Sequence, residues 1–235
     1  MQRVNDAAGD EPQPGAASGL YLAARPAEPE GATASGISPD PPTAAPAHDR
    51  HQAILEAAKQ VGSLLKRDGH GFALAGSVAV YAHGGAGHLQ HDADFCVRRE
   101  DADAVAATLS EAGLLVFEPP EDWLWKAKCL GQDIDLLFEL AHEPVTSEVL
   151  DRAEQLPVDS VVMPVLSATD LLRSLLAAFS EHHCDFGAVL PIARALREKV
   201  DWQRVRQDCE DAPMAAAFLY LLERLRVIAP AKGRP

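Results

Sequence analysis

The sequence predicts an α/β fold in which a mixed sheet flanked by helices is followed by a bundle of helices. Three observations predict it. Short apolar runs of strand length alternate with helical spacing between residues 51 and 165, only helical spacing recurs after residue 166, and residues 1–50 hold eight of the 17 prolines. Because such a proline- and alanine-rich segment buries little apolar surface, we expect residues 1–50 to be a disordered tail.

Composition and charge exclude several classes of protein. With 235 residues, of which 47% are hydrophobic and 24% charged, the chain has the composition of a soluble globular protein, and no apolar run reaches the length of a membrane span. Its start lacks a basic segment followed by an apolar core, so we expect a cytoplasmic location. The four cysteines lie far apart, which is not the spacing of a zinc site. The net charge of −14 disfavours non-specific binding of nucleic acids.

Apolar runs and helical spacing predict the elements of the first half of the chain. The first helix begins at His51 and ends before Gly69, which is a typical helix stop. The further elements are, in order, a strand at 72–75 closed by a turn, a short helix at 78–82, a strand at 93–97, a helix at 100–112, a strand at 114–117 and a hairpin of strands at 123–130 and 132–140.

The second half begins with a predicted strand at 158–166, which Pro164 places at a sheet edge because proline cannot donate to a ladder. Ser167 stands three residues before Asp170, a variant of the capping box that opens a helix over 171–182. Helical spacing then predicts three more helices, at 188–199, 201–210 and 213–227. We therefore expect residues 166–230 to form a helical region that packs on the α/β half.

Two aspartates in one predicted strand and a third in a later strand form the most informative pattern. Asp92 and Asp94 alternate, so their side chains share one face of the strand, with about 7 Å between their Cα atoms. If the strand of Asp135 lies beside them, a third carboxylate joins the cluster. Carboxylates this close repel one another unless a cation neutralises them, and oxygen ligands favour Mg²⁺ or Mn²⁺. Asp133 shares a face with Asp135, so either of the two can be the third ligand.

The Gly76-Ser77 turn precedes this pattern. Glycine lets the backbone approach a ligand, the start of the following helix offers free N–H groups to phosphate, and Ser77 adds a hydroxyl. Together the turn and the aspartates predict metal-dependent nucleotidyl transfer, in which the turn holds the β- and γ-phosphates of an NTP and the aspartates hold the metal on the α-phosphate. Removal of the proton from an acceptor hydroxyl then falls to Asp135.

Three stretches carry a resemblance to a known family: residues 74–85 (LAGSVAVYAHGG), 92–95 (DADF) and 134–137 (IDLL). They resemble the nucleotidyltransferase fold shared by DNA polymerase β-like enzymes, in the branch of small bacterial proteins that includes the AbiEii-type toxins. That pattern is a hydrophobic strand, Gly-Gly or Gly-Ser, a short helix and Asp-x-Asp, with a last Asp on another strand. The resemblance is close over about residues 70–140 and loose over the helical region.

The resemblance implies a nucleotidyltransferase-like domain over residues 51–165 that binds a divalent metal and an NTP. It implies that Asp92, Asp94 and Asp135 are both the catalytic residues and the metal ligands, because the apolar residues at 136–138 favour Asp135 over its neighbour as the third carboxylate. Contacts to the nucleotide are expected from Gly76, Ser77, His88 and Lys126.

Two departures from the family's pattern leave a second hypothesis open. Relatives often have Arg and Thr four and two residues before the first metal Asp, where this chain has His88 and Gln90. A Lys is common in the first trailing helix, where this chain has Leu175, with Arg173 nearby. The alternative is therefore a catalytically degenerate binding or regulatory protein that keeps the fold and is related to toxin–antitoxin systems.

The acceptor is not specified by these motifs. The acidic balance favours a small, cationic acceptor such as an aminoglycoside, or a protein side chain, over unaided capture of RNA. Toxin relatives act on tRNA, so a tRNA acceptor stays open. We expect no membrane partner, and the sequence does not indicate an oligomeric state.

Overall fold

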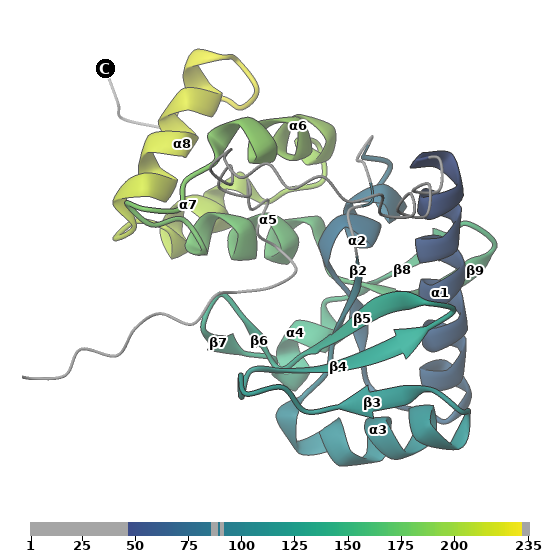
Figure 1. Ribbon diagram of the computed structural model, residues 1–235. Coiled ribbons are helices and arrows are strands. Elements are labelled where there is room, and N and C mark those ends of the chain that lie inside the picture. The colour runs from purple at the N-terminus through teal and green to yellow at the C-terminus, as the bar shows by residue number, and fades with distance from the viewer. Residues whose placement is uncertain (1–46, 86–88, 90–91, 232–235) are drawn as a thin grey trace, which may run out of the picture.

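The computed structural model describes residues 47–85, 89 and 92–231, and it has the α/β fold that the sequence predicts (Figure 1). Its elements in chain order are α1 (Ala47–Arg67), β1 (Ala73–Leu74), α2 (Gly76–Ala82), β2 (Asp92–Cys96), η1 (Arg99–Asp101), α3 (Ala102–Glu111), β3 (Leu115–Phe117), β4 (Leu124–Cys129), β5 (Gln132–Leu137), β6 (Glu139–Leu140), β7 (Glu143–Pro144), α4 (Ser147–Asp151), β8 (Glu154–Val158), β9 (Val161–Val165), α5 (Ala168–Ala177), α6 (Phe186–Leu196), α7 (Trp202–Asp208) and α8 (Pro213–Arg224).

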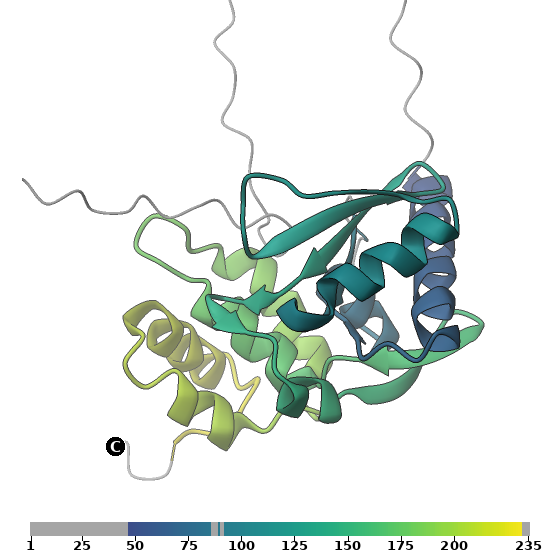
Figure 2. The same cartoon turned by 90° about the horizontal axis from the view of Figure 1, so that it is seen from below.

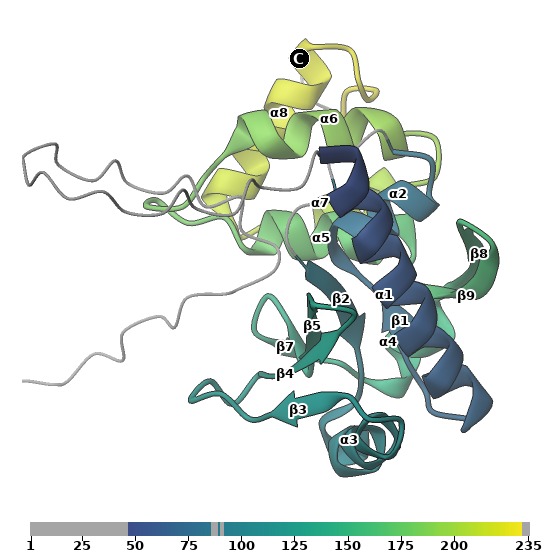
Figure 3. The same cartoon turned by 45° about the vertical axis from the view of Figure 1, so that its right-hand side comes forward.

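One mixed sheet of seven strands, in the order β3-β4-β5-β2-β1-β9-β8, organises the first half of the chain. Strand β2 is parallel to β5 and antiparallel to β1, and β4 and β5 form the predicted hairpin. Helix α1 packs across β2, β5 and β9 and beside α3 (Figure 3). Because side chains alternate along a strand, β2 buries Phe95 on the face that meets α1 and presents Asp92 and Asp94 on the other.

The last four helices, α5 to α8, gather at one side of the sheet (Figure 2, green to yellow). Ser167 caps α5 as predicted, because its hydroxyl accepts a hydrogen bond from the backbone N–H of Asp170 at 3.1 Å. The carboxylates of Asp185 and Asp201 cap α6 and α7 in the same way. Helix α5 contacts α2, which connects these helices to the sheet. Within the described ranges, no helix has both the length and the apolar character that crossing a membrane requires.

The prediction that Pro164 places its strand at the sheet edge is wrong. Strand β9 lies between β1 and β8, and the unpredicted strand β8 forms the edge, pairing with β9 from Glu154 to Val158. The proline is tolerated because β1 has only two residues and meets β9 at Val165, after Pro164. The missing N–H therefore costs no ladder hydrogen bond on that side.

The bounds of some elements also differ from the prediction, and some short elements were not predicted. Helix α1 begins at Ala47, so residues 47–50 of the expected tail are helical, and residues 1–46 of that tail lie outside the described residues. Helix α5 ends at Ala177 rather than 182, because Ser180 and His183 exchange backbone hydrogen bonds in a turn. The single strand predicted over 132–140 is divided into β5 and β6, and β7 and α4, which are too short to produce a periodic pattern, were not predicted.

Candidate active site

Three carboxylates lie together on the face of the sheet opposite α1. Asp92 and Asp94 come from β2 and Asp135 from β5, and the parallel pairing of these strands sets Asp94 directly beside Asp135. One oxygen from each of the three lies within 4.8 Å of the others. The side chains of Asp94 and Asp135 are fully buried, whereas Asp92 is partly exposed. The sequence expectation that the three side chains meet therefore agrees with this geometry.

Asp94 is a buried carboxylate without a hydrogen-bond partner for either oxygen among the described residues. Burial raises the pKa of Asp94 well above its usual value, and the charges of Asp92 and Asp135 raise it further. Such a group is costly unless a cation compensates it. The donor set here consists of carboxylate oxygens alone, which suits a hard divalent cation such as Mg²⁺ or Mn²⁺.

Asp135 is the third member, and its neighbour Asp133 is not. The ammonium of Lys126 on β4 donates to both oxygens of Asp135, at 2.8 and 3.0 Å. Burial raises the pKa of Asp135 although Lys126 opposes the change. Asp133 lies two residues before Asp135 in β5, its side chain is about half exposed, and it forms an ion pair with Lys128. The geometry thus separates the two aspartates that the sequence left as alternatives.

The Gly76-Ser77 turn lies against the carboxylates. The backbone N–H of Ala75 donates to the carbonyl oxygen of Asp94 at 2.8 Å, which holds the turn beside β2. Gly76 begins α2 with a φ of +60°, a conformation that favours glycine. The hydroxyl oxygen of Ser77 is buried and, within the described part of the chain, has no hydrogen-bond partner. Next to Asp94, the turn therefore offers a hydroxyl without a partner in the described part of the chain and the start of a helix, whose first N–H groups have no partner within the helix.

The other predicted nucleotide contacts have different outcomes. His88 lies outside the described residues, as does Gln90. Lys126 contacts Asp135 directly, a pairing that the sequence did not predict. Leu175, at the position where relatives have a lysine, is buried in the core, and Arg173 points into a separate ionic cluster.

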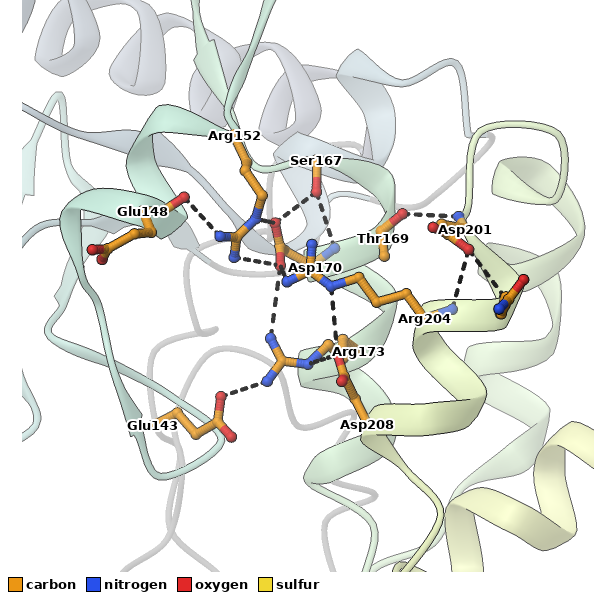
Figure 4. A network of polar contacts seen from close by, with 11 residues as sticks. Glu143, Glu148, Arg152, Ser167, Thr169, Asp170, Arg173, Asp201, Arg204 and Asp208 are labelled. Carbon is orange, nitrogen blue, oxygen red and sulfur yellow. Dashed lines mark hydrogen bonds and ion pairs between the residues drawn. The ribbon is translucent and has the colours of Figure 1, made fainter.

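That cluster surrounds Asp170, which sequence reasoning identified only as part of a helix cap (Figure 4). Arg152 donates two hydrogen bonds to the buried Asp170 carboxylate, at 3.0 and 2.9 Å. Arg173 and Arg204 each have a nitrogen 3.7 Å from it. Arg173 also pairs with Asp208 on α7. The cluster connects the end of α4 with α5 and α7, and its arginines come from separate elements, so no local pattern in the sequence reveals it.

Comparison with known proteins identifies the fold. No family model matches the sequence, and no curated protein matches it. Among solved structures, the chain is similar to the solution structure of the antibiotic-resistance factor ANT(2″)-Ia, with a TM-score of 0.51 and 12% identity over 75% of this chain and 96% of that one. It is also similar to the crystal structure of ANT(2″)-Ia in complex with adenylyl-2″-tobramycin, with a TM-score of 0.50 and 14% identity over 71% and 97% of the two chains.

The chain has a nucleotidyltransferase fold. The lincosamide antibiotic adenylyltransferase LnuA is a more distant neighbour, with a TM-score of 0.45 and 12% identity over 62% of this chain and 97% of that one. The similarity to the two ANT(2″)-Ia structures confirms the resemblance of the sequence at the level of the fold. Membership of the AbiEii-type branch stays a prediction.

Proposed function

We propose that this protein transfers a nucleoside monophosphate from an NTP to a hydroxyl group of an acceptor, with a divalent cation held by Asp92, Asp94 and Asp135. The observation that supports the proposal most strongly is the meeting of the three carboxylates, with the buried Asp94 lacking a partner for either oxygen in the described part of the chain. A carboxylate in this state favours a cation as its missing partner.

The fold supports the same assignment. ANT(2″)-Ia, which shares the fold, has been crystallised with adenylyl-2″-tobramycin, a nucleotide group joined to a small antibiotic. We therefore propose ATP as one donor. A bound cation would neutralise charge on the triphosphate and polarise the α-phosphate.

The residues of this chain have distinct roles in the proposed reaction. The Gly76-Ser77 turn would hold the triphosphate through backbone N–H groups and the buried Ser77 hydroxyl. The acceptor oxygen forms a bond to the α-phosphorus as the bond to the bridging oxygen breaks and pyrophosphate leaves. Asp135 takes the proton of the acceptor hydroxyl as a general base.

We propose a small cationic molecule as the acceptor. The net charge of −14 attracts cations and repels nucleic acid backbones at long range. Aminoglycosides combine several hydroxyls with positive charge, so they are the first acceptors to test, with tRNA as the alternative.

A labelling experiment tests the proposal. The full chain is incubated with Mg²⁺ and each of the four α-³²P-labelled NTPs, together with aminoglycosides, tRNA or cell extract, and labelled products are separated. We expect label to appear in a small-molecule fraction only when Mg²⁺ is present. Absence of label from every fraction would contradict the proposal.

Two variants of neighbouring aspartates make the experiment specific. Asp94→Asn should lower the rate of transfer at least about a hundredfold. Mutation of a residue that only supports a metal ligand already lowers metal affinity or activity by up to about a hundredfold. Asp133→Asn, on the same face of the sheet but outside the cluster, should transfer at nearly the wild-type rate. Equal rates for both variants would exclude the assignment.

A further inference from the structure

Lys126 places a positive charge inside the carboxylate cluster. Its ammonium binds both oxygens of Asp135, at 2.8 and 3.0 Å, and its side chain is 26% exposed. Within the described ranges, it is the only lysine or arginine that forms an ion pair with Asp94 or Asp135. The pairing follows from sheet register, since Lys126 on β4 lies opposite Asp135 on β5, which in turn lies beside Asp94 on β2.

This arrangement compensates the cluster only in part. Asp94 and Asp135 are two acidic groups at adjacent positions of neighbouring strands, and Lys126 brings one positive charge to them. The ammonium engages Asp135 through both oxygens, yet leaves both oxygens of Asp94 without a partner in the described part of the chain. A divalent cation that uses all three carboxylates as ligands therefore meets the ammonium of Lys126 at the oxygens of Asp135, where the two positive charges repel each other.

We infer that Lys126 is a resident counter-ion of the metal site, and that a divalent cation binds by displacing its ammonium from Asp135. The inference rests on the proposed function and concerns how its metal site is kept stable before the metal arrives. Because Lys126 is partly exposed, its released ammonium can turn toward solvent, where an incoming triphosphate offers it a new partner. The same side chain then serves first the empty site and later the nucleotide.

Lys126 could compete with the cation for Asp135 or could orient Asp135 for the cation, and these two roles predict opposite effects on metal affinity. If Lys126 competes with the cation, its removal strengthens metal binding. If Lys126 instead orients Asp135 for the cation, its removal weakens metal binding. Titration of the full chain with Mn²⁺ alone, followed by electron paramagnetic resonance of the free ion, separates the two and needs no nucleotide or turnover.

We expect Lys126→Met to bind Mn²⁺ about tenfold more tightly than wild type, since a nearby positive charge in a buried site strongly opposes a cation. Lys126→Arg keeps the charge and should bind Mn²⁺ with nearly the wild-type affinity. The matched control is Lys128→Met, which removes the ion pair with Asp133 two residues away on the same face and should leave the affinity unchanged. Unchanged or weaker Mn²⁺ binding by Lys126→Met would overturn the inference.

A second measurement guards against a folding defect in the variant. Without metal, Lys126→Met leaves the buried Asp135 uncompensated, so its melting temperature should fall below that of wild type. Saturating Mn²⁺ should then raise the melting temperature of Lys126→Met more than that of wild type, and an equal or smaller rise would contradict the inference. Failure of the proposed function looks different, because wild type itself would then neither bind Mn²⁺ nor transfer label.

Discussion

Gly76 and Asp94 are in such close contact that a Cβ atom placed on Gly76 would lie 1.8 Å from Oδ2 of Asp94. No side chain fits at that distance. The φ of Gly76, +60°, is in addition one that residues with a Cβ rarely adopt. The glycine therefore allows the turn to close over the buried carboxylate, and its place in the sequence motif has a steric reason.

Replacement of this glycine should damage the site and the fold together. We expect Gly76→Ala to lower the free energy of unfolding by about 3 kcal/mol or more, since it adds a steric clash to backbone strain. Gly69→Ala is the matched control, because Gly69 has a φ of +74° with nothing within 4 Å of the added Cβ. It should cost only about 1–2 kcal/mol. Urea unfolding of both variants measures the difference between their free energies of unfolding. Equal losses would show that the contact with Asp94 leaves room for a Cβ atom at residue 76.

Neutralising Asp94 should stabilise the metal-free protein. The pKa of Asp94 is higher in the folded state than in the unfolded chain, so the folded state holds the proton more tightly. Its contribution to stability is present at low pH and is lost as the pH rises above about 4, the ordinary pKa of an aspartate. We therefore expect Asp94→Asn to exceed wild type in stability by about 2 kcal/mol at pH 8 in the presence of a chelator.

The pH and metal dependence of that difference provides the check. Urea unfolding at pH 8 and at pH 4 should show the advantage of Asp94→Asn shrinking at the lower pH, where wild-type Asp94 is protonated. Added Mg²⁺ should remove the advantage at pH 8 by stabilising wild type alone. A variant that is less stable than wild type at pH 8 without metal would contradict this account of the buried charge.

Removal of the Ser77 hydroxyl should weaken the binding of ATP without lowering the stability of the fold. Because the hydroxyl oxygen is buried without a partner in the described part of the chain, Ser77→Ala should leave the free energy of unfolding unchanged or slightly raised. The affinity for ATP should fall about tenfold to a hundredfold, which corresponds to one lost hydrogen bond to a charged group. Calorimetric titration with ATP measures the affinity, and thermal melting measures the stability. Unaltered ATP affinity would remove Ser77 from the nucleotide site.

The ionic cluster around Asp170 should matter for stability. Asp170→Asn leaves three arginines facing a neutral side chain, so we expect a loss of about 3–5 kcal/mol. Burial raises the pKa of Asp170, but hydrogen bonds from Arg152 and Ser167 outweigh it and hold the pKa below its usual value. This contribution is therefore present above about pH 4 and is lost as the pH falls further.

An exposed ion pair is the control for that prediction. Glu198 pairs with Arg197 at the surface, and Glu198→Gln should cost no more than about 0.5 kcal/mol. Chemical denaturation between pH 3 and pH 7 compares the two variants with wild type. If Asp170→Asn costs as little as the surface variant, the cluster does not hold α4, α5 and α7 together.

Local patterns in the sequence were sufficient to predict much of the candidate site. The alternation of Asp92 and Asp94 fixes their common face, and the Gly76-Ser77 motif indicates the turn beside them. Their meeting with Asp135 depends on strand order, which the resemblance to a known fold supplied. Ser167 predicted the start of α5 because capping is a local interaction.

Features that depend on distant contacts were not accessible in this way. The bond between Lys126 and Asp135 requires the register of the β4–β5 hairpin, and the arginines around Asp170 come from three different elements. Pro164 misled the prediction because its tolerance depends on the short length of a neighbouring strand. In each case the position of the residue in the fold depends on contacts between distant segments rather than on the conformational preference of the residue itself.

Calorimetric titration of the full chain with Mn²⁺ is the decisive test of whether three carboxylates on two neighbouring strands hold one divalent cation. Wild type, Asp94→Asn and Asp133→Asn are compared. We expect wild type and Asp133→Asn to bind one Mn²⁺ with similar affinity and Asp94→Asn to bind it at least about a hundredfold more weakly. If Asp94→Asn binds Mn²⁺ with the affinity of wild type, the three carboxylates are not the metal site.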